Sequence, residues 1–137
     1  MGVTNRKSVY PFAECVEVQM EGTTSIDVMT IPKGTIIEKV IARVTIQGTG
    51  TPGNLIVGDD DDDNGFITAV AATGAVGTVI GDVPTEHGDY LYDSTVKGGY
   101  IKLYASAGKE VKAVLSADTA TVEPAFQIIV YGKRYSV

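Results

Sequence analysis

The chain has 137 residues, the size of one domain, and a fold of this size can bury a self-supporting core. Its 44% hydrophobic and 20% charged residues exclude a disordered chain, and its net charge of −6 disfavours nucleic acid as a partner because phosphate backbones are repelled. A single cysteine, Cys15, excludes an internal disulfide, and a single histidine, His87, excludes a histidine-cluster metal centre.

The chain also lacks the sequence signals of a membrane or secreted protein. No apolar run approaches the roughly 20 residues that a bilayer-spanning helix needs. The charged N-terminal stretch is not followed by the apolar run of a signal peptide, and Arg6 stands where a myristoylation signal has Ser or Thr. We therefore expect a soluble protein that is made inside the cell, without membrane contact or a lipid anchor.

Alternating apolar and polar residues, the pattern of half-buried strands, dominate the first half of the chain. Residues 1–10 lack this alternation and are predicted to form an N-terminal arm, which leaves residues 11–137 as a single domain. The first predicted strands cover residues 15–20 and 25–31. A Pro-Lys-Gly turn at residues 32–34 then leads into the longest predicted strand, residues 36–47.

The second half of the chain continues the same alternation. The predicted strands cover residues 54–58, 66–72, 90–92, 100–105, 111–117 with an extension at 119–122, and 125–131, while residues 73–88 read as a long loop. About eight short strands, with turn signals about every ten residues and no amphipathic helix, favour an all-β antiparallel sandwich or barrel. Within this class we expect a β-sandwich of the jelly-roll type.

The acidic run at residues 59–63, followed by an Asn-Gly turn, allows two interpretations. Read from Asp60, it is D-x-D-x-N-G, so Asp60, Asp62 and Asn64 match the first half of a calcium loop. The twelfth position of that loop is Ala71 instead of the bidentate Glu, and strands rather than helices flank it. The alternative is a solvated hairpin tip whose carboxylates keep a sheet edge soluble. We expect no cofactor, apart from a weak Ca²⁺ site under the first interpretation.

His87, between Glu86 and Asp89, would be the general base if the protein were an enzyme, with Ser94 or Cys15 as the nucleophile. The chain contains neither a Gly-x-Ser-x-Gly turn nor a glycine-rich phosphate loop followed by a helix. We therefore expect His87 to be a solvated loop histidine and the protein not to be an enzyme.

Two further groups are candidate contact residues. Four tyrosines recur on faces that read as polar, and tyrosine is enriched at protein interfaces, although packing at the rim of the sandwich would also explain them. These interface candidates are Tyr90, Tyr92, Tyr100 and Tyr104. Arg6 and Lys7 form a basic pair in the arm of an acidic protein, which indicates a tether to an acidic neighbour, the alternative being a frayed terminus.

Two segments together resemble small virion proteins of tailed bacteriophages. The first is the Ile-Pro-Lys-Gly-Thr turn at residues 31–35 with the long strand after it, and the second is Leu-Ile-Val-Gly-Asp at residues 55–59 with Asp-Asp-Asn-Gly-Phe at residues 62–66. The likeness covers residues 26–68. Virion proteins with these segments are similar to head decoration (cement) proteins, which are β-sandwich subunits that sit as trimers on the outer capsid.

The resemblance implies a homotrimer that binds the outer surface of the major capsid protein and stabilises the phage head. It also implies synthesis in the host cytoplasm and a final location in the virion, on the capsid surface. On this reading Arg6 and Lys7 are the candidate capsid contacts. The alternative is a tail or fibre component, or a glycan-binding module of the virion whose tyrosine-bearing loops hold a host sugar.

Overall fold

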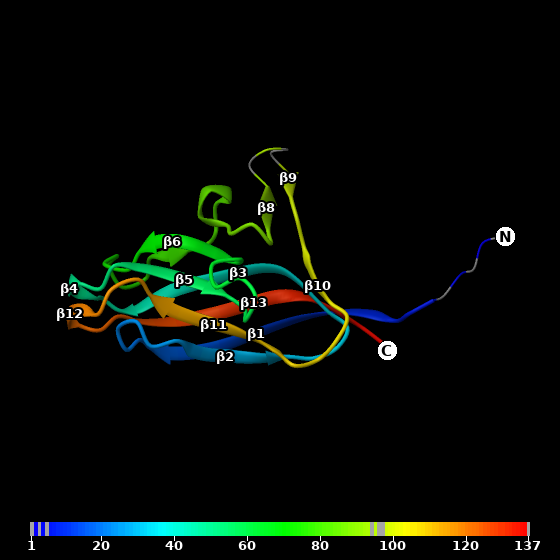
Figure 1. Cartoon of the computed structure of the whole chain (residues 1–137), viewed down its shortest axis with the longest axis horizontal. Helices are drawn as coiled ribbons and strands as arrows, with labels where there is room; N and C mark the ends of the chain where they lie inside the picture. Colours follow the sequence, from blue (N-terminus) through cyan, green and yellow to red (C-terminus); the bar gives the residue numbers. More distant parts are fainter. Residues whose placement is uncertain (1, 3, 5, 94, 96–97, 137) are drawn as a thin grey trace.

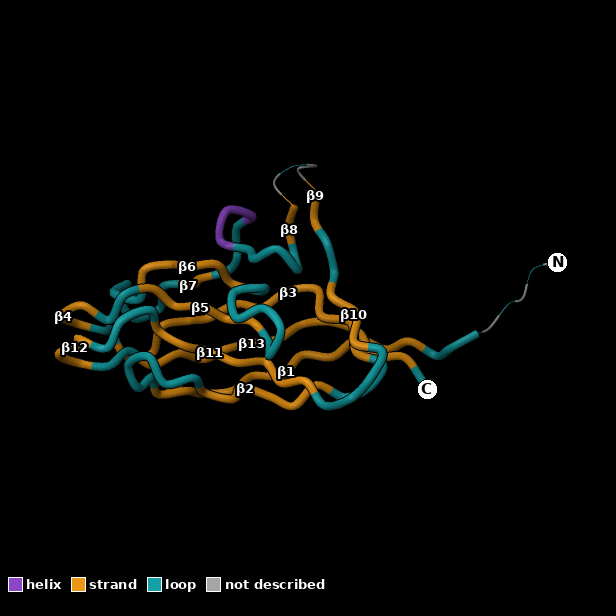
Figure 2. Tube along the Cα trace, in the orientation of Figure 1, coloured by secondary structure: helices purple, strands orange, loops and turns teal. Residues whose placement is uncertain are grey.

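The computed structural model describes residues 2, 4, 6–93, 95 and 98–136. Its strands form two antiparallel sheets that pack as a sandwich (Figures 1 and 2), so the all-β sandwich prediction is confirmed. In the described residues the only helical element is one 3-10 turn, η1 (Pro84–Glu86). No helix in this part of the chain is long and apolar enough to cross a bilayer.

Two sheets and two short strand pairs make up the fold. The first sheet has the order β1–β13–β3–β10, with β7 also on β3: β1 (Val9–Gln19), β13 (Ala125–Tyr135), β3 (Thr35–Ile46), β10 (Lys102–Tyr104) and β7 (Val79–Ile80). The second sheet has the order β2–β11–β5–β6: β2 (Ile26–Ile31), β11 (Lys109–Leu115), β5 (Asn54–Gly58) and β6 (Ile67–Ala71). The short pairs are β4 (Thr49–Thr51) with β12 (Thr119–Val122), and β8 (Tyr92–Asp93) with β9 (Gly98–Gly99).

The pairing of the eight main strands is that of a jelly roll. Counted along the chain, the first pairs with the eighth (β1 with β13), the second with the seventh (β2 with β11), the third with the sixth (β3 with β10) and the fourth with the fifth (β5 with β6). The chain is thus one antiparallel ribbon, which wraps so that β13 also pairs with β3 and β11 with β5. This arrangement agrees with the predicted jelly roll.

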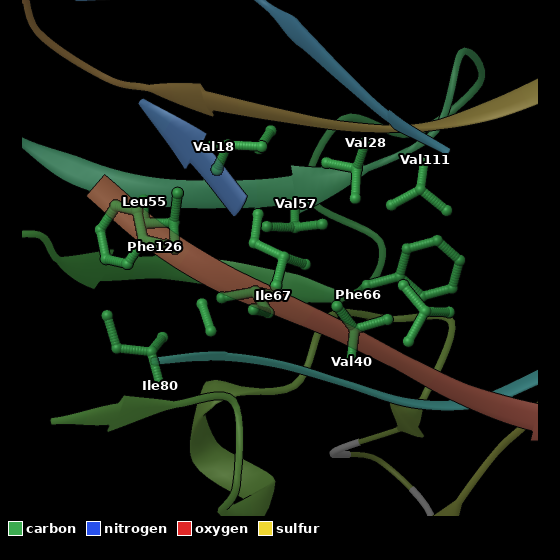
Figure 3. Close-up of a cluster of buried hydrophobic side chains, with 14 of the residues drawn as sticks. Val18, Val28, Val40, Leu55, Val57, Phe66, Ile67, Ile80, Val111 and Phe126 are labelled. Atoms are coloured by element: carbon green, nitrogen blue, oxygen red, sulfur yellow. The ribbon is translucent and has the colours of Figure 1, made fainter. Parts of the chain in front are cut away.

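The inward side chains of both sheets form one core. Alternation along each strand sends every second side chain inward, where apolar residues leave water. Figure 3 shows Val40 and Phe126 of the first sheet with Leu55, Val57, Ile67 and Val111 of the second, all completely buried.

β13 shifts register against β3 between Ala125 and Phe126 and again between Tyr131 and Gly132, and the second shift breaks the alternation in the middle of β3. It lets Ile37 and Val40, three residues apart, both point into the core. A Cβ atom at Gly132 would lie 1.9 Å from the backbone oxygen of Ile36, so only glycine fits there.

β1 begins at Val9, inside the segment that the sequence assigned to the arm. It pairs with β13 over its whole length, from Val9 opposite Tyr135 to Gln19 opposite Ala125. Phe12 packs against the core, and the Arg134 guanidinium lies 4.2 Å from the centre of its ring. Residues 6–8, directly before β1, extend away from the sandwich (Figure 1).

Candidate functional site

The acidic run forms a tight loop between β5 and β6. The backbone N–H of Asp59 donates to the carbonyl of Asp62 at 2.9 Å, and the N–H of Phe66 donates to the carbonyl of Val57 at 2.9 Å. The loop folds back onto Gly58 so closely that a Cβ atom there would lie 2.0 Å from the carbonyl oxygen of Asp62. The sequence therefore needs glycine at the point where the strand ends and the acidic run begins.

Asp59 is the buried residue of this loop, with 3% of its surface exposed. Its carboxylate accepts four hydrogen bonds, two of them from the backbone N–H groups of Asp61 and Asp62, at 2.9 Å each. The other two come from the Tyr90 hydroxyl at 3.0 Å and the Tyr104 hydroxyl at 2.5 Å. A carboxylate removed from water requires such donors, and here all of them come from the chain itself.

These contacts change the acidities of the three groups. Burial raises the pKa of Asp59, but the hydrogen bonds from Tyr104, from the two backbone amides and from Tyr90 outweigh it, so the pKa lies below the ordinary value. Burial and the hydrogen bond to Asp59 raise the pKa of Tyr104 and of Tyr90 far above the ordinary range. Asp59 is therefore a charged acceptor and the tyrosines are neutral donors.

The tyrosines connect this loop to the opposite sheet. Tyr104 lies on β10 of the first sheet, whereas Asp59 follows β5 of the second, so their hydrogen bond joins the two layers. Tyr90 packs edge-on against Phe66, with ring centres 5.3 Å apart, and the ammonium group of Lys102 lies 4.2 Å from the centre of the Tyr90 ring. We call Asp59, Tyr90, Lys102 and Tyr104 the Asp59 cluster.

The predicted calcium ligands are directed to other partners. Asp60 forms an ion pair with Lys112 of β11 at 2.8 Å, which lowers its pKa, and Asp62 accepts the backbone N–H of Asn64 at 3.3 Å. Among the described residues, no group of three or more His, Cys, Asp or Glu side chains is arranged to hold a metal ion. The Ca²⁺ site stays a prediction, and Asp60, Asp61 and Asp63 are exposed, as at a solvated tip.

The structure divides the four candidate tyrosines. Tyr104 is 5% exposed, so its predicted place on an outward face is wrong, because its hydroxyl is turned inward to Asp59. Tyr90 is half-buried in the same cluster, Tyr92 is half-buried on β8, and Tyr100 is 47% exposed between β9 and β10. An interface role for these residues stays a prediction.

Sequence reasoning missed the central role of Asp59, although a signal for it was present. Leu55 and Val57 point inward on β5, and the alternation of a strand places Asp59 on the same side. A carboxylate at an inward position requires internal donors, so strand periodicity could have separated Asp59 from the rest of the acidic run.

His87 contributes to the loop structure. Its Nε2 atom lies 3.0 Å from the backbone oxygen of Gly81, and its backbone bridges Ile67 of β6. Cys15, one of the two suggested nucleophiles, is exposed on β1 of the other sheet, while Ser94 lies outside the described residues. The structure therefore gives His87 a hydrogen-bonding role and does not bring it to Cys15.

The basic pair lies in the extended segment before β1. Arg6 and Lys7 are both exposed. The Lys7 ammonium group lies 3.4 Å from the backbone oxygen of Ser136 and 5.5 Å from the centre of the Tyr135 ring. Lys7 is exposed despite these contacts, so its ammonium group is accessible to another molecule.

Comparison with known proteins gives matches in structure and none in sequence: no protein-family model and no curated protein matches the chain. One solved structure with a similar fold is a chain of the capsid asymmetric unit of cyanophage Pam1, at 13% identity and a TM-score of 0.54, covering 100% of this chain and 93% of that one. Another is a chain of the acidic stable capsid structure of Helicobacter pylori bacteriophage KHP30, at 12% identity and a TM-score of 0.51, covering 96% and 99%. At these identities the likeness shows the shared fold.

Proposed function

We propose that this chain is a structural protein of a tailed-phage virion, namely a decoration (cement) protein that binds the outer surface of the major capsid protein and stabilises the head. The observation that carries the proposal is the match of fold, over nearly the whole length of both chains, to chains from two phage capsid structures. The likeness of residues 26–68 to phage virion proteins supports it independently. Fold alone would not be enough, because jelly rolls also serve as lectin and enzyme domains.

The architecture suits a role without chemistry. Two sheets share one core, and the bond between Asp59 and Tyr104 joins them at one end, so the domain is stiff. Such a subunit acts as a homotrimer on the capsid. Three weak contacts held in a rigid assembly bind far more tightly than one, because the second and third form at high effective concentration.

The test is to add the purified protein to phage heads that lack it. We expect saturable binding, with a fixed number of copies per head, and decorated heads that withstand heating better than bare ones. A folded sample that leaves the heads bare, as judged by co-sedimentation, overturns the proposal. Antibody labelling of intact virions provides the second measurement, because label on the tail or fibres would favour the tail component instead.

A further inference from the structure

The two edge strands of the first sheet, β1 and β10, are each paired with another strand on one side only. β10 pairs with β3 and β1 pairs with β13, and within the described residues no strand is paired to the outer edge of either. An open strand edge presents backbone N–H and C=O groups that can pair with another chain. The first sheet therefore has two edges at which a second molecule could add.

Exposed apolar side chains lie at both of these edges. At the β10 edge, Ile101 is 58% exposed and Leu103 is 51% exposed. At the β1 edge, Val9 is 55% exposed and Tyr10 is 53% exposed. Large apolar side chains that are exposed as a group often mark a surface where another molecule binds.

The strand register places the two apolar edges at the same end of the sheet. Leu103 lies opposite Ile36, Ile36 lies opposite Lys133, and Lys133 lies opposite Pro11. These four residues form one row across the sheet, so Leu103 on one edge and Pro11, beside Tyr10, on the other are at the same level. A neighbouring copy that continues the sheet would therefore bring the two apolar edges together.

The charges beside the two edges have opposite signs. Arg6 and Lys7 are separated from the start of β1 by Ser8 alone. At the other edge, Asp61 of the acidic run lines the same surface pocket as Leu103. Asp61 already pairs with Lys109, but within the described residues neither Asp62 nor Asp63 has a lysine or arginine partner. Lys102 and Lys109 line the same pocket, but Lys109 pairs with Asp61 and Lys102 lies over the Tyr90 ring. Asp62 and Asp63 are therefore the carboxylates that the basic pair of another copy could meet.

Strand direction is compatible with this contact. β1, β13, β3 and β10 are antiparallel in turn, so β1 and β10 run in opposite directions. A rotation axis parallel to the strands preserves these directions in the next copy, whose β10 would then meet β1 antiparallel. Repeated contacts between two different patches close into a ring when the rotation closes.

We propose that copies of this chain assemble edge to edge, with the β1 edge of one copy against the β10 edge of the next, and that Arg6 and Lys7 bind the acidic loop of that neighbour. The inference rests on the homotrimer of the proposed function and identifies its interface. It gives the basic pair a different partner from the capsid contact expected from the sequence.

Disulfide trapping in the absence of heads tests the contact. The double variant Pro11→Cys with Leu103→Cys joins two exposed positions of one row, and with Cys15→Ser it should form covalent trimers on oxidation, seen on a non-reducing gel. The matched control pairs Pro11→Cys with Val122→Cys, an exposed residue on β12, and should stay uncrosslinked. The inference is overturned if the control crosslinks to the same extent or if either single-cysteine variant forms dimers. It is also overturned if light scattering shows that the protein is a monomer.

Charge reversal tests the role of the arm. Arg6→Glu with Lys7→Glu should weaken trimer formation about tenfold or more at low salt, and adding Asp62→Lys with Asp63→Lys should restore it. Reversed variants that stay trimeric but no longer bind heads would assign the arm to the capsid and overturn the inference. If the wild-type protein binds heads but the double-cysteine variant gives no crosslink, only the proposed interface is overturned. If the crosslinked trimers form but leave heads bare, only the proposed function is overturned.

Discussion

The acidic loop and the N-terminal arm carry opposite charges, and they differ in where those charges find partners. Asp59 in the loop is 3% exposed and accepts four hydrogen bonds from its own chain. Arg6 and Lys7 in the arm are exposed, and the Lys7 ammonium group lies 3.4 Å from the backbone oxygen of Ser136 and 5.5 Å from the centre of the Tyr135 ring. A charge that folding buries must be satisfied within the fold, whereas a charge left in water is available to another molecule.

We expect the largest effect on the free energy of unfolding from a substitution of the buried residue, Asp59. Asp59→Ala removes the acceptor of four hydrogen bonds and leaves the Tyr104 hydroxyl buried without its partner, so the free energy of unfolding should fall by about 3–4 kcal/mol. Urea denaturation at pH 7 and fixed protein concentration measures the change. Asp63→Ala, in the exposed part of the same loop, is the control and should change it by less than about 0.5 kcal/mol. Equal effects at the two positions would remove the distinction between Asp59 and the acidic tip.

The two tyrosines of the Asp59 cluster differ in burial, so they test whether a hydrogen bond to Asp59 stabilises the fold more when its donor is buried. Tyr104→Phe removes a donor to a charged acceptor in a buried site and should lower the free energy of unfolding by about 2 kcal/mol. Tyr90→Phe removes the same type of donor from a half-buried ring, where water can replace it, and should cost about 1 kcal/mol. The same denaturation assay ranks them, and Tyr90→Phe costing more than Tyr104→Phe would contradict the expected order.

The pH dependence of stability tests whether Asp59 is charged in the folded state. Its pKa in the folded chain lies below the ordinary value, so the stability it contributes is complete above the unfolded-state pKa, near 4, and is lost as the pH falls through the folded-state pKa. The difference in unfolding free energy between the wild type and Asp59→Asn should be constant from pH 7 to pH 5. Below about pH 4 it should shrink, by at most about 1.4 kcal/mol per pH unit.

Urea titrations of both proteins at pH 7, 5, 4 and 3 measure this difference. The other carboxyl groups titrate in both proteins and largely cancel in the comparison. A difference that widens on acidification would mean that Asp59 is neutral in the folded chain.

Local sequence patterns predicted the layers of this fold better than its connections. Alternation predicted the inward face of β3 over residues 40–44 and that of β13 over residues 126–130, because a strand has a fixed period of two. It did not predict that Ile37 points inward and Ile46 outward, because the register shifts of this strand pair break the period. The partners of Asp59 could not be predicted in this way, since Tyr90 and Tyr104 lie 31 and 45 residues further along the chain. The early start of β1 was missed because residues 9–11 are all exposed and are held in the strand by pairing with β13.

The smallest expected effect on the fold lies in the arm. Deleting residues 2–7 removes the Lys7 contacts with Ser136 and Tyr135 and leaves the pairing of β1 with β13 intact. The unfolding free energy of the dilute, monomeric protein should therefore change by less than about 0.5 kcal/mol, while light scattering at high concentration should show the loss of the trimer. The full-length chain at the same dilution is the control. If the deletion destabilised the monomer as much as Tyr104→Phe does, the arm would be part of the fold, and its charges would not be reserved for a second molecule.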